Sequence, residues 1–338
     1  MKRALVIGGT GFVGINLVDA LLAAGVEVRV STRPSSATLL LRKRKIERAA
    51  ASLEDPEALR RAMDGCDVVY LAGGYYPRYS LSLEASLAEG VPGVRNACEA
   101  ALAAGVERFV YTSTVAILGP APEGRAADER DLLAEMPEGS VYRGVKWAME
   151  RELEAARARG LGTVSMLTGG CVGPNDLKVG SGAFIVGVVT GALPWLVDGF
   201  INIVDVGDVA LAHVRAASAP AGSRYCVAGH DLRIRALLER VARRYGGKVP
   251  SLELDAGAAR ERAEADERAA APKRARVPIP REMVDMVTHG QPVSSARVTR
   301  ELGVEFSPLD DALDRAYDWF AKLKLVPPRE MRSTHDHV

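Results

Sequence analysis

Two residues that could transfer a proton lie one helical turn apart in the segment YRGVK. Tyr142 and Lys146 are four residues apart within residues 142–159, a run whose pattern predicts a helix. Side chains at this spacing share one helix face, so a lysine ammonium can lie beside a phenol and favour its ionised form. A phenol tuned in this way can act as a general acid or base. The same spacing fits two unrelated residues, so the surrounding elements must decide.

The chain around this segment alternates between strand and helix patterns. Helical spacing is found in residues 15–25 and 56–63, among others. Short apolar runs predict strands at residues 4–9, 26–33, 67–73, 108–113 and 163–167. This alternation predicts an α/β fold with a doubly wound parallel Rossmann sheet that is covered by helices on both faces.

The turn between the first strand and the first helix is rich in glycine. Its sequence GGTGFVG supplies Gly8, Gly11 and Gly14. Backbone N–H groups at a helix amino terminus can bind the pyrophosphate of a dinucleotide, and glycines permit its close approach. Because the motif falls between strand and helix of the first βαβ unit, it predicts dinucleotide binding rather than a plain tight turn.

The candidate proton-transfer residues gain a third partner from the strand that precedes them. This strand brings Ser113 and Thr114 to a carboxyl end of the sheet, where open α/β folds bind ligands. The helix with Tyr142 and Lys146 follows after a loop, so both can meet Thr114 near a nicotinamide. We expect the lysine to lower the pKa of the phenol and the threonine hydroxyl to orient a substrate oxygen.

Motifs along nearly the whole chain resemble those of the extended short-chain dehydrogenase/reductases, the NAD-dependent epimerase/dehydratase family. Within that family the chain is most similar to the dihydroflavonol-reductase-like group, which includes hopanoid-associated sugar-epimerase-like proteins and 3β-hydroxysteroid dehydrogenase relatives. The motifs are GGTGFVG, DVVYLAG, ERFVYTS, YxxxK, CVGPND, INIVDVGDVALAH, SSARVTRELG and ALDRAYDWF.

The resemblance implies a Rossmann domain and a smaller carboxyl-terminal substrate-binding domain. It places residues 1–170 in the dinucleotide-binding domain, with 201–225 returning to it, and residues 171–200 and 226–330 in the substrate-binding region. Residues 331–338 lack apolar periodicity, which predicts a disordered tail. By the same resemblance, helices near residues 93–104 and 142–159 would form a homodimer.

The resemblance also assigns roles to individual residues. Tyr142 becomes the general acid/base, Lys146 holds the nicotinamide ribose and tunes the tyrosine, and Thr114 occupies the serine/threonine position. The implied cofactor-binding residues are Gly8, Gly11, Phe12, Val13, Gly14, Arg33, Leu71, Ala72, Gly73, Tyr142, Lys146, Thr168 and Cys171.

Three positions depart from the family pattern. Gly90 stands where an asparagine is usual, which removes an expected contribution to proton relay. Ser52 stands where the family often has an aspartate that contacts the adenine, and Thr168 replaces a proline. None of these departures removes the Thr114, Tyr142 and Lys146 trio.

Cofactor choice depends on the end of the second strand, VRVSTRPSS. NAD binders commonly place an acid there for the ribose 2′-hydroxyl, whereas an arginine suits a 2′-phosphate. Arg33 follows this strand with no acid close to it in the sequence, so NADP, as NADPH, is predicted over NADH. The basic run of residues 42–45 could add to this attraction, but it is more typical of a solvated helix face.

The substrate segments carry few cations. Between Leu161 and Val214 the only basic residue besides His213 is Lys178, whereas a nucleotide-diphosphate sugar needs cationic groups. A small, largely neutral and partly apolar substrate is predicted, although distant arginines such as Arg281 and Arg297 leave a sugar nucleotide open. The alternative is that this segment only packs as a core helix, through Phe184, Ile185, Val188, Val189 and Trp195.

The expected activity is that of an enzyme, an NAD(P)-dependent oxidoreductase with reversible hydride transfer at a hydroxyl or ketone. Family dehydratases carry an acidic pair after the catalytic threonine, but Val115 and Ala116 follow Thr114, so dehydration is disfavoured. The alternatives are a sugar or nucleotide-sugar epimerase with retained NAD(P), and a non-catalytic dinucleotide-binding redox sensor.

Composition excludes several other classes. The formal net charge is +1 with acids and bases interspersed, which predicts no nucleic-acid partner and no membrane surface. The four cysteines have no zinc-like spacing, so we expect reduced thiols, no metal and a cytoplasmic location.

Overall fold

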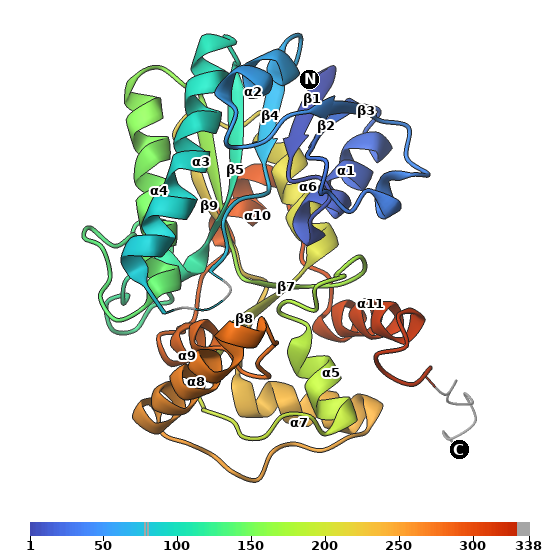
Figure 1. Cartoon of the computed structure of the whole chain (residues 1–338), viewed down its shortest axis with the longest axis vertical. Helices are drawn as coiled ribbons and strands as arrows, with labels where there is room; N and C mark the ends of the chain where they lie inside the picture. The colour runs from blue at the N-terminus through green and yellow to red at the C-terminus, as the bar shows by residue number, and fades with distance from the viewer. Residues whose placement is uncertain (78, 80, 330–338) are drawn as a thin grey trace.

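The computed structural model describes residues 1–77, 79 and 81–329, and a parallel sheet forms its centre (Figure 1). The sheet has seven strands in the order β3-β2-β1-β4-β5-β6-β9. The strands are β1 (Arg3–Ile7), β2 (Glu27–Thr32), β3 (Glu47–Ala50), β4 (Val68–Leu71), β5 (Arg108–Thr114), β6 (Thr163–Thr168) and β9 (Arg224–Val227). The order reverses between β1 and β4, and ligands of such sheets bind at this switch point. The predicted doubly wound parallel sheet is therefore confirmed.

Helices cover both faces of this sheet. One face packs against α1 (Phe12–Ala23) and α6 (Val206–Ala216). The other face packs against α2 (Pro56–Met63), α3 (Leu83–Ala103) and α4 (Val141–Ala158). Strands such as β4 are buried along their whole length, which explains their unbroken apolar runs.

A smaller domain lies beyond the carboxyl ends of these strands (Figure 1). Its sheet has the order β10-β8-β7, with β8 antiparallel to β10 and parallel to β7. These strands are β7 (Gly170–Val172), β8 (Phe200–Asp205) and β10 (His230–Arg233). The remaining helices are α5 (Ala183–Thr190), α7 (Ile234–Tyr245), α8 (Ala256–Ala270), α9 (Arg281–Thr288), α10 (Ala296–Leu302) and α11 (Leu309–Lys322), with short 3-10 turns η1 (Leu39–Leu41), η2 (Val115–Ile117) and η3 (Ala271–Lys273).

Two segments differ from the elements that the sequence predicts. Residues 42–45 follow η1 as a turn, so the solvated helix face expected there is wrong, and Arg44 instead pairs with Asp19 on α1. The interleaved charges and alanines of residues 259–278 predict an exposed helix that runs into a flexible link. These residues contain most of α8 and all of η3, and Ala259 and Ala263 of α8 are completely buried. The predicted tail at residues 331–338 lies outside the described residues.

Candidate functional site

Tyr142 lies in the first turn of α4, close to the carboxyl end of β5. Ser140 caps this helix and accepts a hydrogen bond from the backbone N–H of Arg143. The side chain of Thr114, the last residue of β5, lies close enough to the phenol of Tyr142 to lower its pKa. Both side chains are buried. The structure therefore brings together two of the three residues that the sequence predicts as catalytic.

Lys146 is the third member of this group. Its Nζ lies 5.9 Å from the centroid of the Tyr142 ring and donates a hydrogen bond of 3.4 Å to the backbone carbonyl of Tyr75. Burial lowers the pKa of Lys146 to about 8, because the surrounding protein solvates the ammonium less well than water. The lysine can therefore change its charge in a mildly alkaline solution.

The phenol of Tyr142 is harder to ionise than an ordinary tyrosine. Burial raises its pKa to about 12, the side chain of Thr114 opposes this increase, and the charge of Glu282 adds to it. The expected lowering of this phenol's pKa toward the working range is wrong for this structure, because burial has the largest effect and raises the pKa. The protonated phenol is suited to donate a proton, which is the role of a general acid.

Ser113 precedes Thr114 but serves a different network. Its hydroxyl donates to Glu150 at 2.9 Å, and the hydroxyl of Ser165 donates to the other oxygen of the same carboxylate at 2.6 Å. Glu150 is almost fully buried and also pairs with Arg224 at 3.3 Å. Ser113 therefore ties β5 to α4, and Thr114 is the neighbouring residue that acts on the pKa of Tyr142.

The predicted dinucleotide turn is held by backbone contacts that only glycine permits. Gly8 has a φ of +89°, and a Cβ there would lie 2.4 Å from Gly73 at the end of β4. A Cβ on Gly14 would lie 2.1 Å from the carbonyl oxygen of Gly8. Gly11 caps α1 with no side-chain hydrogen bond, which leaves the amino end of this helix without a capping side chain. Such a helix end can bind a phosphate through its backbone N–H groups.

The other predicted cofactor residues lie at the carboxyl ends of neighbouring strands. Leu71 ends β4 and is followed by Ala72 and Gly73, and Phe12 and Val13 begin α1.

Thr168 ends β6 and donates a hydrogen bond of 3.0 Å to the carbonyl of Ser113. Cys171 follows in β7, near enough to Tyr142 to influence its pKa. Burial raises the pKa of the Cys171 thiol to about 12, so this thiol stays protonated. All four cysteines are buried and free, as expected.

Arg33 is exposed directly after β2, where the sequence predicts a contact with a 2′-phosphate. The fold brings one acid, Glu54, near Arg33, although the two residues are far apart in the sequence. Glu54 follows β3, the strand beside β2, and the charge of Arg33 contributes to lowering its pKa after the larger effect of a hydrogen bond with Ser52. Glu54 therefore competes with a phosphate for the attraction of Arg33.

Gly90 lies on the inner face of α3, opposite Tyr75. A Cβ at this position would lie 2.8 Å from Cδ1 of Tyr75 and 2.9 Å from Cε of Met149. The hydroxyl of Tyr75 donates to Ser86 at 3.1 Å on the same helix. The ring of Tyr75 thus fills the space beside Gly90. The backbone carbonyl of Tyr75 accepts the hydrogen bond from Lys146.

Tyr76 and Glu282 are residues of the site that sequence reasoning missed. The rings of Tyr76 and Tyr142 are 5.4 Å apart, and Glu282 forms a hydrogen bond with Tyr76. Glu282 is buried at the start of α9, far from Tyr142 in the sequence. The signal that could have found it is an acid next to apolar residues in the substrate segment, since Met283 and Val284 follow it.

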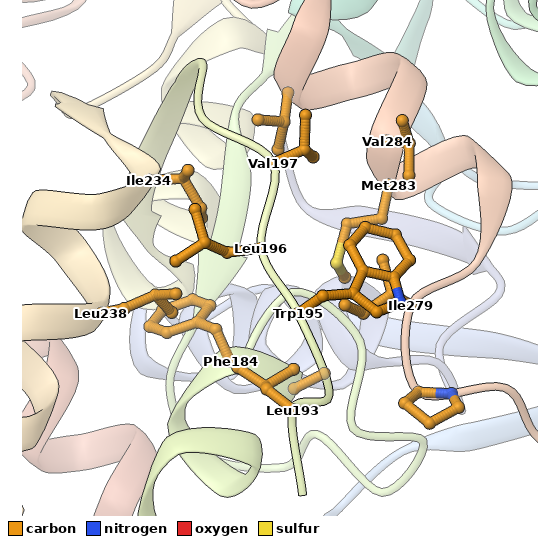
Figure 2. A pocket seen from close by; sticks show the side chains of 13 residues that line it. Phe184, Leu193, Trp195, Leu196, Val197, Ile234, Leu238, Ile279, Met283 and Val284 are labelled. Atoms are coloured by element: carbon orange, nitrogen blue, oxygen red, sulfur yellow. The ribbon is translucent and has the colours of Figure 1, made fainter. Parts of the chain in front are cut away.

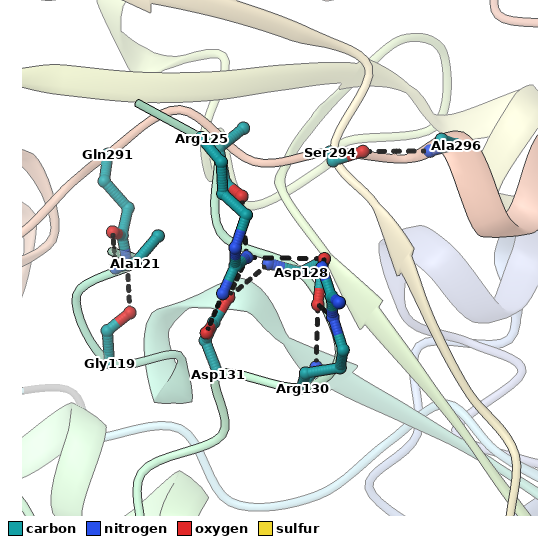
Figure 3. A network of polar contacts seen from close by, with 10 residues as sticks. Gly119, Ala121, Arg125, Asp128, Arg130, Asp131, Gln291, Ser294 and Ala296 are labelled. Atoms are coloured by element: carbon teal, nitrogen blue, oxygen red, sulfur yellow. Dashed lines mark hydrogen bonds and ion pairs between the residues drawn. The ribbon is translucent and has the colours of Figure 1, made fainter. Parts of the chain in front are cut away.

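The loop that follows Thr114 is fastened to the carboxyl-terminal part of the chain (Figure 3). The side-chain amide of Gln291 donates to the carbonyl of Gly119 at 2.7 Å, and Arg125 pairs with Asp131 at 2.6 Å. These contacts lie close behind η2. They therefore link the position of the reactive threonine to the smaller domain.

Arg281 and Arg297, the distant cations considered for a sugar nucleotide, are engaged elsewhere. Arg281 contacts Glu264 and the carbonyl of Gly139. Arg297 pairs with Glu301 and stacks over a tyrosine of β9.

The apolar segment before β8 contains both core residues and residues that line a cavity, which are the two interpretations that the sequence left open. Ile185 and Val188 are core residues, whereas Phe184 and Trp195 also line a cavity of about 40 Å³ (Figure 2). Within the described residues, no helix is long and apolar enough to cross a membrane, and no cluster of side chains fits a metal ion.

Comparison with known proteins adds to this geometry. The profile of the "NAD dependent epimerase/dehydratase family" matches residues 4–228. The chain belongs to this family. The predicted resemblance is therefore confirmed, and with it the assignment to a family of NAD(P)-binding oxidoreductases and epimerases.

Named relatives cover nearly the whole chain. The "Putative dihydroflavonol 4-reductase" of Synechocystis sp. is 30% identical over 93% of each chain. The "Sterol demethylase protein B" of Methylococcus capsulatus is 28% identical over 95% of this chain and 99% of its own. A solved structure, a nucleoside-diphosphate-sugar epimerase from Pseudomonas aeruginosa, superposes with a TM-score of 0.80 at 26% identity over 96% of this chain and 99% of that one.

Proposed function

We propose that the chain is an NAD(P)-dependent oxidoreductase that transfers hydride reversibly at a hydroxyl or ketone of a small, largely neutral substrate. The proximity of Thr114 to the phenol of Tyr142, with Lys146 Nζ 5.9 Å from the same ring, carries this proposal. The glycine cradle around Gly8 and Gly14 fits a dinucleotide, because a Cβ at either position would fill the turn. When bound, the nicotinamide supplies or accepts the hydride.

The protein's own residues move the proton. In the reductive direction the hydroxyl of Tyr142 donates its proton to the carbonyl oxygen, and the hydroxyl of Thr114 orients that oxygen. The raised pKa of Tyr142 keeps the phenol protonated, and the positive charge of Lys146 stabilises the tyrosinate that forms. The reverse direction uses the same groups with the proton moving back.

NADPH is the proposed cofactor, on the strength of Arg33 at the end of β2. A neutral substrate is supported by Lys178 being the only lysine or arginine between Leu161 and Val214. The relative named for a sterol reaction is consistent with an apolar alcohol or ketone.

Two other functions have an observation in their favour. The similarity to a nucleoside-diphosphate-sugar epimerase favours an epimerase that retains its cofactor. Gly90 at the usual asparagine position favours a redox sensor that binds a dinucleotide without turnover. The paired Thr114 and Tyr142 favour catalysis over sensing, because binding alone needs no phenol with a perturbed pKa.

A homodimer is proposed from the resemblance to family members that pair through these helices. Residues 93–104 and 142–159 fall in α3 and α4, which lie side by side on one outer face of the sheet (Figure 1). Light scattering at working concentration should give twice the chain mass of 36.0 kDa. A monomer would refute the pairing.

The test of the main proposal is a titration of the purified protein with NADPH and with NADH, followed by nicotinamide fluorescence. A panel of neutral ketones, aldehydes and sugar nucleotides is then added. Tight NADPH binding with oxidation by a neutral ketone would support the reductase. Binding without oxidation by any of them would favour the sensor, and interconversion of sugar nucleotides would favour the epimerase.

A further inference from the structure

The cavity in the smaller domain is enclosed almost entirely by carbon atoms (Figure 2). Phe184 comes from α5, Leu238 from α7, and Met283, Val284 and Val287 from α9. None of the side chains that line it carries a charge. An apolar cavity of this kind stays dry unless an apolar group enters it.

One polar group interrupts this wall. Trp195 is 2% exposed, and its indole Nε1 has no hydrogen-bond partner among the described residues. Figure 2 shows the indole beside Ile279 and Met283. A buried donor without an acceptor is unfavourable, and Trp N–H groups usually find a partner when buried. An acceptor on a ligand would remove this deficit.

Helix α9 contributes residues to the cavity wall and also carries Glu282, whose charge acts on Tyr76 and Tyr142. Glu282 faces Tyr76 and Tyr142, while the next two residues, Met283 and Val284, face the cavity. The apolar wall therefore begins at the residue that follows Glu282 in α9. Methionine is a flexible side chain that adapts its shape to a ligand.

We propose that this cavity binds the distal end of the substrate, an apolar terminus that carries one hydrogen-bond acceptor for the indole N–H of Trp195. This inference rests on the proposed function and narrows its substrate to a neutral ketone or alcohol with an apolar tail. The cavity of about 40 Å³ compares with about 10–15 Å³ for one water, so it holds about three or four non-hydrogen atoms.

The experiment measures binding and turnover separately. Calorimetry of the intact protein uses straight-chain 2-alkanones of increasing length and diketones of the same lengths with the second carbonyl near the far end. Three variants are compared: Trp195→Phe, which removes the donor and makes the ring smaller; Val284→Phe, which fills the cavity; and Met286→Phe, a control on α9 outside the cavity lining.

Affinity should rise with chain length and then level off, and the diketones should bind about tenfold more tightly than the 2-alkanones. Trp195→Phe should abolish the preference for diketones and leave the 2-alkanones within twofold. Val284→Phe should weaken only the longer ligands, by about tenfold, and Met286→Phe should bind like the parent protein. If Val284→Phe does not fold, Trp195→Phe decides the question.

The outcomes separate this inference from the proposed function. If the variants change binding as expected but NADPH reduces no ketone, the cavity binds an apolar tail and the proposed reductase activity is refuted. If NADPH reduces ketones but neither chain length nor Trp195→Phe changes their affinity, the reductase activity is supported. The proposal that the cavity binds the apolar tail is then overturned.

Discussion

The turn between β1 and α1 has no space for a Cβ atom at Gly8 or Gly14, whereas the smaller domain across the site encloses an apolar cavity. In the turn between β1 and α1, backbone atoms pack directly against other backbone atoms. Such a fixed surface suits one rigid ligand such as a pyrophosphate. The cavity wall is made of adaptable side chains, which suits ligands that vary in shape. The proposed catalytic residues lie on β5 and α4, outside both surfaces.

The largest effect is expected where the turn is tightest. Gly14→Ala should lower the free energy of unfolding by about 3 kcal/mol, because the new Cβ would lie 2.1 Å from the carbonyl oxygen of Gly8 and backbone must shift. Gly11→Ala is the matched control. Its nearest contact would be 3.2 Å, and its φ of −83° suits any residue, so it should change stability by less than about 1 kcal/mol. Equal urea midpoints for the two variants would contradict this description.

A second substitution tests the space beside Lys146. Gly90→Asn should destabilise the protein by about 1–3 kcal/mol, because the new side chain displaces Tyr75. The double variant with Tyr75→Ala should recover about 1 kcal/mol, since the removed ring leaves room. Urea unfolding of the two single variants and the double variant measures this coupling. Strict additivity would show that Tyr75 does not restrict this position.

A smaller effect is expected when Arg33, the residue proposed to contact the 2′-phosphate of NADPH, is replaced. Arg33→Ser should weaken NADPH binding about tenfold and leave NADH within twofold, since only the 2′-phosphate loses a charged partner. Glu54→Gln is the opposite control and should strengthen NADPH binding by about twofold, because Glu54 competes for Arg33. Fluorescence titration measures both affinities. Equal losses for the two cofactors would show that Arg33 does not discriminate between them.

The smallest effect is a pH dependence. A base with a lowered pKa keeps its proton below that pKa, so Lys146 is charged below about pH 8 and neutral above it. The rate of ketone reduction should be constant at lower pH and fall to about half at pH 8, while Tyr142 stays protonated. In Lys146→Met the rate should be low and lack this decline. A decline that persists in this variant would assign it to another group.

The sequence predicted the parts of this molecule that follow from local pattern. The apolar runs and the glycine turn were sufficient for the parallel sheet, and the YxxxK spacing placed Tyr142 and Lys146 on one helix face. Contacts between distant segments could not be predicted in this way. Glu282 meets Tyr142 only because α9 folds back over the site, and burial reverses the expected pKa shift of the phenol.

The proton donor is the most direct test of the account. Stopped-flow or steady-state oxidation of NADPH by a neutral ketone should be about a thousandfold slower in Tyr142→Phe than in the parent protein. NADPH affinity, measured by fluorescence on the same samples, should stay within twofold, because the glycine turn and Arg33 are intact. Undiminished ketone reduction by Tyr142→Phe would contradict the proposed role of Tyr142.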